Sequence, residues 1–271
     1  MVSLTLSAKT ITTGSILKNP ESATIYNNHI YVTNMGEKSW KNPDKDGFIS
    51  KLSLDGKAVD LKFTEELNDP KGMAVYKDSL VVTDITELVI IDFKSKKVLR
   101  KIKTPGVFLN DIYVSEEGVA YVTDTYKSKI YSVDLLTSKV TVIKENMQEA
   151  PNGIYLIKND LYIASWANKL ESDWSAKAKG RFLKINLKNN LETFITRANL
   201  GNLDGVEPLS AGKWLVSDKK GNVVYEVDEK SGEYKALDMV FTDVADIHYS
   251  LKHGLLVAPL MGEGKLIILK I

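Results

Sequence analysis

The sequence of 271 residues contains no cysteine and only three histidines. Without cysteine there are no disulfides, no thiolate metal sites and no cysteine nucleophiles. The chain also lacks an excess of charge of either sign: 36 basic residues balance 35 acidic ones, giving a formal net charge of +1. Near-neutral charge gives no case for a nucleic-acid surface, and no apolar run is long enough to cross a bilayer. We therefore expect a small-molecule ligand, with no nucleic-acid or membrane partner.

The start of the chain lacks the features of a secretory signal. The stretch MVSLTLSAKTITTG alternates like a β-strand and has neither a basic start nor an apolar block. A mature chain whose signal had been removed would look the same. The compartment therefore stays open between an exported, periplasmic location and the cytoplasm.

What the sequence does contain is a repeat. Six strand-like runs, rich in β-branched and aromatic residues, recur in register: IYVTNMGE, LVVTDITE, AYVTDTYK, LYIASWAN, WLVSDKKG and LLVAPLMG. Each run follows a partner strand across a turn and precedes a third strand, and five units add a fourth. Units of about 45 residues with four strands are typical of propeller blades.

The repeats predict an all-β fold, a six-bladed β-propeller with four antiparallel strands per blade, in one domain spanning residues 1–271. A β-sandwich would not produce six in-phase units, and a β-helix has a much shorter repeat. The last unit lacks a fourth strand, while residues 3–11 form a strand without a unit. Because a propeller ring must close, we expect this N-terminal strand to complete the last blade.

A polar residue opens the innermost strand of each unit. In the PNG segment this residue is Asn152, between Pro151 and Gly153. Innermost strands surround the central channel, so six equivalent side chains are expected to converge on the axis. The predicted ring consists of Glu21, Lys71, Asn110, Asn152, Asp204 and Asp246.

Apart from Lys71, the ring offers only amide and carboxylate oxygens. Oxygen ligands favour a hard divalent cation, with Ca²⁺ first and Mg²⁺ second, and the absence of histidine and thiolate argues against zinc. The alternative is that these residues only make turn hydrogen bonds. Lys71 could pair with Glu21 or Asp204 and take the place of a metal, or it could meet a negative charge on a substrate.

Other residues are candidates for substrate contact or catalysis. The long segments after Asn34 and after Ser165 carry Trp40 and Trp166 and are expected on the metal face of the channel. His248 lies two residues after Asp246 on an inner strand and could face the channel. The strand endings VTD and VSD place aspartates where they are expected to cap the following turns, at Asp84, Asp124 and Asp218.

Four short motifs resemble the calcium-dependent six-bladed propellers of the gluconolactonase and regucalcin (senescence marker protein) superfamily. These motifs are PES at 20–22, LNDI at 109–112, PNGI at 151–154 and LDGVE at 203–207. The resemblance implies calcium, or alternatively Mg²⁺ or Mn²⁺, bound by Glu21, Asn110, Asn152 and Asp204. It also implies hydrolysis of lactones or related esters, with Asp204 or Glu207 as the acid/base.

The sequence departs from that superfamily at two places. Ser22-Ala23-Thr24 replaces the usual Gly-Pro-aromatic segment, and Phe108 replaces the arginine that sugar lactonases carry two residues before the third-blade asparagine. The second departure weakens the case for a sugar-acid lactone. The nearest pattern is that of a gluconolactonase-like bacterial branch whose members are typically exported. A non-catalytic propeller that binds a small molecule or a protein is the alternative function, because a fold does not fix an activity.

Overall fold

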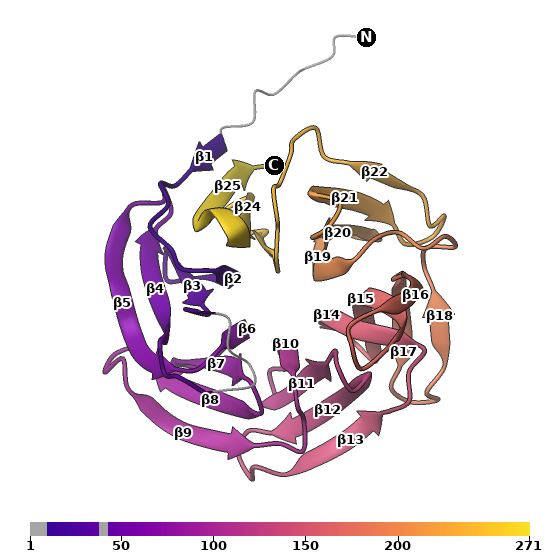
Figure 1. The fold of residues 1–271 in the computed structure, drawn as a ribbon, viewed down its shortest axis with the longest axis horizontal. Coiled ribbons are helices and arrows are strands. Elements are labelled where there is room, and N and C mark those ends of the chain that lie inside the picture. The colour runs from indigo at the N-terminus through magenta and orange to yellow at the C-terminus, as the bar shows by residue number, and fades with distance from the viewer. Residues whose placement is uncertain (1–9, 38–42) are drawn as a thin grey trace.

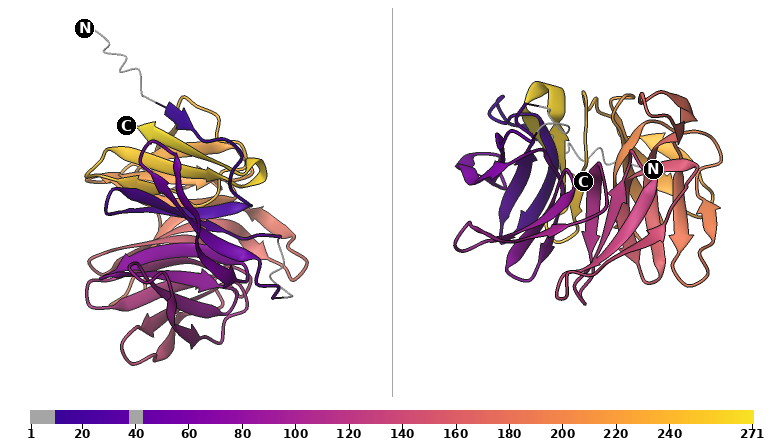
Figure 2. Two further views of the ribbon diagram at one scale, coloured as in Figure 1. Left: turned by 90° about the vertical axis from the view of Figure 1, so that its left-hand side faces the viewer. Right: turned by 60° about the horizontal axis from the view of Figure 1, so that its bottom comes forward.

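The computed structural model describes residues 10–37 and 43–271. Six antiparallel sheets stand around a central axis in chain order (Figure 1). The side views in Figure 2 show the sheets as blades of a short cylinder. This confirms the predicted six-bladed propeller. The only helix among the described residues is a single 3₁₀ turn, η1 (Met261–Glu263), and none of them forms a helix that could span a membrane.

The first three blades are regular four-stranded meanders. The first contains β2 (Pro20–Tyr26), β3 (His29–Asn34), β4 (Gly47–Ser53) and β5 (Ala58–Leu67). The second contains β6 (Pro70–Tyr76), β7 (Ser79–Asp84), β8 (Glu87–Asp92) and β9 (Val98–Lys103). The third contains β10 (Leu109–Val114), β11 (Val119–Asp124), β12 (Lys129–Asp134) and β13 (Val140–Lys144). Within each blade, chain order equals spatial order from the axis outward.

The other three blades each carry a variation. The fourth contains β14 (Glu149–Ile157), β15 (Asp160–Leu170), β17 (Phe182–Asn186) and β18 (Glu192–Phe194), and β15 also pairs with the extra strand β16 (Ala176–Lys179). The fifth contains β19 (Leu203–Ser210), β20 (Lys213–Asp218), β21 (Val223–Asp228) and β22 (Tyr234–Ala236). The sixth contains β23 (His248–Ser250), β24 (Leu255–Leu260), β25 (Lys265–Lys270) and β1 (Thr10–Thr12).

The N-terminal strand closes the ring, as predicted. β1 is the outermost strand of the last blade and pairs antiparallel with β25, with Thr10 opposite Leu269 and Thr12 opposite Ile267. The part of the predicted strand before residue 10 lies outside the described residues. This pairing covers the outer edge of β25 and ties the start of the chain to its last blade.

The hydrophobic core fills the space between neighbouring blades. Second strands are covered on both faces, and Leu80, Val81 and Val82 on β7 are all 0% exposed. Val81 packs with Val122 and Tyr131 of the next blade. Each such side chain contributes about 1.5–3 kcal/mol when it is fully buried. This explains why the second-strand runs are apolar on both faces.

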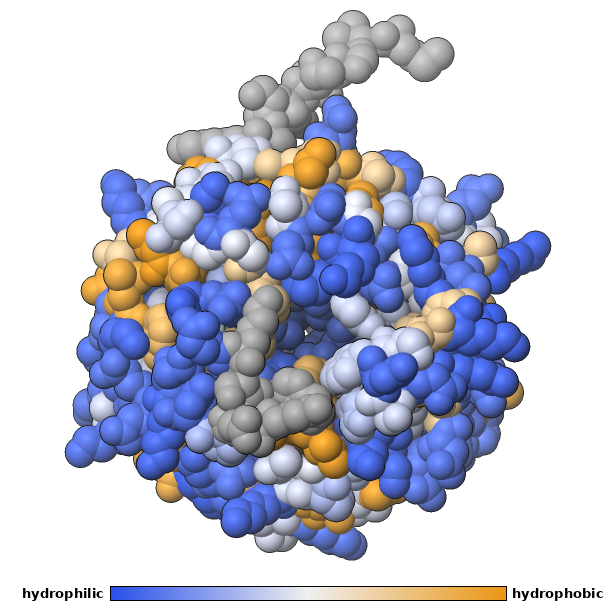
Figure 3. All heavy atoms as spheres, viewed as in Figure 1, coloured by the Kyte–Doolittle hydropathy of each residue, from blue (hydrophilic) through white to orange (hydrophobic). Residues whose placement is uncertain are grey.

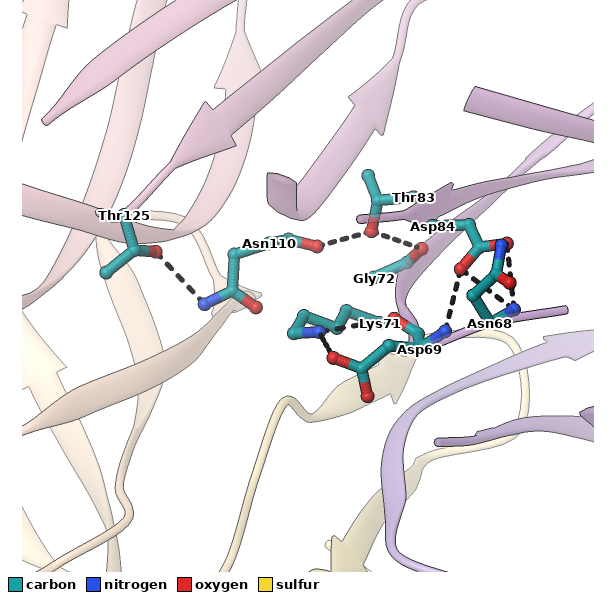
Figure 4. A network of polar contacts seen from close by, with 8 residues as sticks. All are labelled: Asn68, Asp69, Lys71, Gly72, Thr83, Asp84, Asn110 and Thr125. Atoms are coloured by element: carbon teal, nitrogen blue, oxygen red, sulfur yellow. Dashed lines mark hydrogen bonds and ion pairs between the residues drawn. The ribbon is translucent and has the colours of Figure 1, made fainter. Parts of the chain in front are cut away.

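The VTD and VSD endings join neighbouring blades as well as capping turns. Thr83 Oγ1 donates to the carbonyl oxygen of Asn110 at 2.6 Å, and Thr123 Oγ1 donates to that of Asn152 at 2.7 Å. Each hydroxyl therefore fixes the start of the inner strand in the next blade. Figure 4 shows the Thr83 contact.

The aspartates at these strand ends hold loops in place. Asp124 accepts hydrogen bonds from the backbone of Lys127 in the following turn and of Val107 in the loop that enters its own blade. Asp218 does the same with Gly221 and Asn202. The predicted capping of the following turn is confirmed for these two residues. Asp84 bonds only the entering loop, through Asn68 and Asp69.

Glycine after Asn152 reflects the close approach of inner strands. A Cβ at Gly153 would lie 2.1 Å from the backbone oxygen of Asp204 in the next blade. We expect Gly153→Ala to lower the free energy of unfolding by about 2–3 kcal/mol, because the core would be overpacked against backbone. Denaturant unfolding measures the change. Gly14→Ala, whose nearest neighbour is 3.9 Å away, should change it by less than about 0.5 kcal/mol. Equal effects at the two sites would contradict the close-packing explanation.

Candidate functional site

Two cavities occupy opposite ends of the channel. The narrow cavity, of about 180 Å³, is lined by the first residues of the inner strands, and the wide cavity, of about 620 Å³, by later residues of the same strands. On β19, for example, Asp204 lines the narrow cavity and Glu207 the wide one. Figure 3 shows the molecular surface along the axis, with a central hollow surrounded mostly by hydrophilic residues.

The narrow cavity gathers five of the six predicted ring residues. They come from five different blades and are all at most 7% exposed: Glu21, Lys71, Asn110, Asn152 and Asp204. The position that these residues share in the sequence repeats therefore corresponds to one shared cavity in the structure. The remaining walls are formed by Met35, Asp69, Phe108, Thr125, Trp166, Trp174, Lys219 and Met261.

The sixth ring position was misaligned by one residue. The Ser217 hydroxyl donates to the carbonyl oxygen of Ala245 at 2.8 Å, just as Thr123 does to Asn152. The Asp246 carboxyl group accepts a hydrogen bond from the backbone N–H of the next residue, just as Asp111 does. Both aspartates line the wide cavity. Ala245 thus holds the ring position in the sixth blade. The sixth inner strand is short, starting only at His248, so the sequence pattern there is weak.

Glu21 and Asp204 are the two carboxyl groups of the ring. Burial raises the pKa of Glu21 well above its usual range, and the charge of Asp204 raises it further. Burial likewise raises the pKa of Asp204 to about 6, against the lowering effects of Lys219 and of the hydrogen bond from Asn152. Such shifts mean that two buried negative charges lack full compensation from the protein.

The side-chain amides of the two asparagines are held in place by hydrogen bonds that their nitrogens donate. Nδ2 of Asn152 donates to Asp204 Oδ1 at 3.0 Å and to the Leu203 carbonyl at 3.2 Å. Nδ2 of Asn110 donates to Thr125 Oγ1 at 3.0 Å. The amide nitrogens are thereby committed, and the side-chain oxygens remain as acceptors. Oδ1 of Asn152 is buried without a hydrogen-bond partner.

Lys71 pairs with a residue that the sequence analysis did not select. Its ammonium forms a short ion pair with Asp69 Oδ2 and also bonds the Asp69 carbonyl at 3.2 Å (Figure 4). It lies 4.6 Å from the centre of the Phe108 ring, a cation–π distance. Lys71 thus forms an ion pair in the channel, with Asp69 as its partner instead of Glu21 or Asp204. Asp69, two residues earlier on the entering loop, supplies the counter-charge instead.

Lys219 is a second cation that the sequence analysis missed. Its Nζ is buried, lines the narrow cavity and lies 3.3 Å from Asp243 Oδ1 without forming a hydrogen bond. Lys219 directly follows β20, just as Thr125 follows β11 and Trp166 follows Ser165. The same position after the second strand thus lines the cavity in several blades. Aligning that position across the repeats would have found it.

Aromatic rings form one wall of the narrow cavity. Phe108 and Trp174 meet edge to face with ring centres 5.0 Å apart, and Trp166 lines the same cavity. Both tryptophans come from the long segment that forms β15 and β16, on the face where the sequence placed it. Trp40 lies outside the described residues.

Glu207 and His248 lie in the wide cavity, apart from Asp204. Nδ1 of His248 lies 2.9 Å from Glu207 Oε1, and both side chains are partly buried. His248 does face the channel, as expected. The structure does not bring the two predicted acid/base residues, Asp204 and Glu207, into one cavity.

The narrow cavity contains buried oxygen atoms that lack hydrogen-bond partners in the described part of the chain. Three buried oxygens there have no hydrogen-bond partner in the described structure: Glu21 Oε2, Asp69 Oδ1 and Asn152 Oδ1. Lys71 is paired with Asp69 and Lys219 with Asp243, which leaves Glu21 and Asp204 as two negative charges to be matched. Orphaned buried acceptors around two carboxylates fit an added divalent cation. Among the described residues, no group of three or more His, Cys, Asp or Glu side chains is arranged to hold a metal ion, so a cation here would need the amide oxygens as well.

The fold and the two axial cavities define a six-bladed β-propeller. Comparison with solved structures finds the same fold in virginiamycin B lyase from Staphylococcus aureus, at 11% identity and a TM-score of 0.67, covering 98% of this chain and all of the other. A catalytically inactive variant of that lyase with quinupristin matches at 10% identity and a TM-score of 0.64, over 98% and 100% of the two chains.

An auxiliary nutrient binding protein from Bacteroides thetaiotaomicron is also similar, at 10% identity and a TM-score of 0.72, over 97% of this chain and 76% of the other. No family model and no curated protein sequence matches the chain. These similarities show the propeller fold alone. They do not test the resemblance to the gluconolactonase and regucalcin superfamily.

Proposed function

We propose that the narrow cavity is a Ca²⁺ site and the reaction centre of a hydrolase that acts on lactones or related esters. One observation carries the proposal: three buried oxygens without hydrogen-bond partners among the described residues and the two carboxyl groups of the ring meet in one cavity on the propeller axis. Glu21, Asn152 and Asp204 would hold the ion, with Asn110 as a further ligand or a substrate contact. Mg²⁺ and Mn²⁺ are the alternative ions.

A bound Ca²⁺ would polarise the carbonyl or phosphoryl oxygen of a substrate. The protein supplies the other requirements. Asp204 has a raised pKa and can accept a proton near neutral pH. Asn152 orients the Asp204 carboxylate through its 3.0 Å hydrogen bond. The wide-cavity position of Glu207 leaves Asp204 as the carboxylate base of this site.

The walls indicate which esters the cavity would take. Phe108, Trp166 and Trp174 present apolar surface, while Lys71 and Lys219 present positive charge. A compact ester or lactone with an aromatic or alkyl part and a negative group fits both features. Phe108 stands where the sugar lactonases of the resembled superfamily carry arginine, which favours a less polar substrate than a sugar acid.

A turnover panel tests the proposal. Lactones, aryl esters and phosphotriesters would be incubated with the protein in calcium buffer and, separately, with excess chelator. We expect hydrolysis of at least one class in calcium buffer and its loss with chelator. Turnover that persists unchanged in chelator would contradict metal dependence.

The second candidate function is non-catalytic binding. The observation that favours it is the pair of lysines in the narrow cavity, which already supply positive charge there. Under this hypothesis the channel holds a structural ion or relies on the Lys71–Asp69 ion pair, and no ester is turned over. Calcium binding without any turnover across the panel would favour it.

Calcium affinity is expected to depend on pH. Ions bind the deprotonated carboxylates, and the pKa of Asp204 is raised to about 6 while that of Glu21 is also raised. Lowering the pH from 8 to 5 should therefore weaken calcium binding, and the loss should begin above the usual carboxylate range because both pKa values are raised. Calorimetric titrations at several pH values measure this. A pH-independent affinity between 8 and 5 would contradict a carboxylate site.

A further inference from the structure

The wide cavity at the other end of the channel is a second concave site with its own chemistry. Its volume of about 620 Å³ is in the range of small-molecule sites, and residues of all six inner strands, most of them apolar, form its wall. None of the lysines or arginines in the described part of the chain lines it, whereas the narrow cavity has two lysines. In a chain with 36 basic residues, this separation of charge distinguishes the two ends of the channel.

Three carboxyl groups line the wide cavity, and two of them are fully engaged. Asp111 accepts from the backbone N–H groups of Ile112 at 2.7 Å and Ile154 at 3.0 Å, one to each oxygen. Asp246 accepts from Ile247 at 2.8 Å and from the Ser22 hydroxyl at 2.5 Å. Both serve to tie inner strands together across the channel. Their oxygens are committed to the fold.

Glu207 is the carboxylate that remains for a ligand. Its Oε1 lies 2.9 Å from His248 Nδ1, and its side chain is 13% exposed. Among the described residues no other hydrogen bond reaches Glu207, so Oε2 is available. The His248 contact fixes the orientation of the carboxylate.

Tyrosine rings stand beside this carboxylate. Tyr113 and Tyr155 both line the cavity, their ring centres 4.9 Å apart, and Tyr26 and Tyr249 complete the aromatic wall. Burial raises the pKa of both Tyr113 and Tyr155, and the charge of Glu207 raises each further. Aromatic faces together with one available carboxylate are the groups that recognise an organic ammonium ion.

We propose that the wide cavity binds a small organic cation of the ammonium class, with Glu207 as its counter-ion and Tyr113 and Tyr155 as aromatic contacts. The site is separate from the proposed hydrolytic site and does not depend on it. Charge complementarity favours this ligand: among the described residues, three carboxyl groups and four tyrosines line the cavity, no lysine or arginine does, and His248 is engaged with Glu207. An anionic ligand would meet no lysine or arginine of the described residues there.

Calorimetry with a matched pair of probes tests this site. Choline carries a quaternary ammonium, and 3,3-dimethylbutan-1-ol has nearly the same shape without the charge. At pH 8 we expect saturable one-to-one binding of choline and at least about tenfold weaker binding of the neutral alcohol. Equal affinity for the two probes, or no saturable binding of choline, would overturn the proposal.

Three variants locate the binding. Glu207→Gln keeps an oxygen for His248 but removes the charge, and should weaken choline binding about tenfold or more. Glu233→Gln, on the exposed surface, and Glu21→Gln, in the narrow cavity, should leave it unchanged. If Glu21→Gln weakens choline binding and Glu207→Gln does not, the cation lies in the other cavity and the proposal is wrong. Thermal melting of each variant verifies that it is folded.

Discussion

Replacing Asp69 with asparagine is expected to lower the free energy of unfolding by about 3–5 kcal/mol. The side chains of Lys71 and Asp69 are only 5% and 3% exposed, so the variant would leave an ammonium buried without its counter-charge. Glu21 and Asp204 share the cavity, but neither forms an ion pair with Lys71. Denaturant unfolding in chelator buffer measures the loss.

Two further variants separate the cost of the unpaired buried charge from other effects of the Asp69→Asn substitution. The double variant Asp69→Leu/Lys71→Met removes both charges and should recover much of the lost stability, since apolar replacement of a buried pair is often neutral. Asp60→Asn breaks a more exposed pair, with Lys96, and should cost no more than about 1 kcal/mol. If Asp69→Asn costs as little as Asp60→Asn, Lys71 does not depend on Asp69 for its charge balance.

Replacing Asp204 with asparagine is expected to reduce turnover by about 10²–10⁴-fold. The variant keeps the volume of the side chain and an oxygen that can accept the hydrogen bond from Asn152, so the fold should survive. It removes both a proposed ion ligand and the proposed base. Steady-state rates on whichever ester class responds in the panel measure the effect.

The matched control is Asp238→Asn, the same chemical change on the exposed surface, which should leave the rate within about twofold of the original. Thermal melting with and without calcium accompanies the rates. Full turnover by Asp204→Asn would remove Asp204 from the chemistry and leave the channel as a binding site.

The propeller could be predicted because each blade repeats the same local pattern. The apolar second strands, such as Leu80–Val82, must be buried on both faces, and this requirement recurs six times in register. The closing of the ring by the N-terminal strand could be predicted because the last repeat lacks a fourth, outer strand. The ring of Glu21, Lys71, Asn110, Asn152 and Asp204 followed from the same phase.

The errors arose where the repeat is weak or where partners come from outside it. The sixth inner strand is only three residues long, so the sequence selected Asp246 where the structure has Ala245. Lys71 finds Asp69 through a loop geometry that strand periodicity does not describe. Glu207 lies three residues after Asp204 on β19. Because β19 runs along the channel, Asp204 lines the narrow cavity and Glu207 lines the wide one. The position of a side chain along the channel axis depends on how its strand runs relative to that axis. A pattern of residue types does not contain this information.

The most direct measurement is calorimetric titration of chelator-stripped protein with Ca²⁺, read beside the melting temperature. The proposed site predicts one-to-one binding that is lost in Glu21→Gln, and a melting temperature that rises with calcium because the ion binds only the folded chain. At a free calcium concentration 100 times the Kd, the added stability is about 2.7 kcal/mol. No binding heat and no shift with Ca²⁺, Mg²⁺ or Mn²⁺ would contradict a metal site in the narrow cavity.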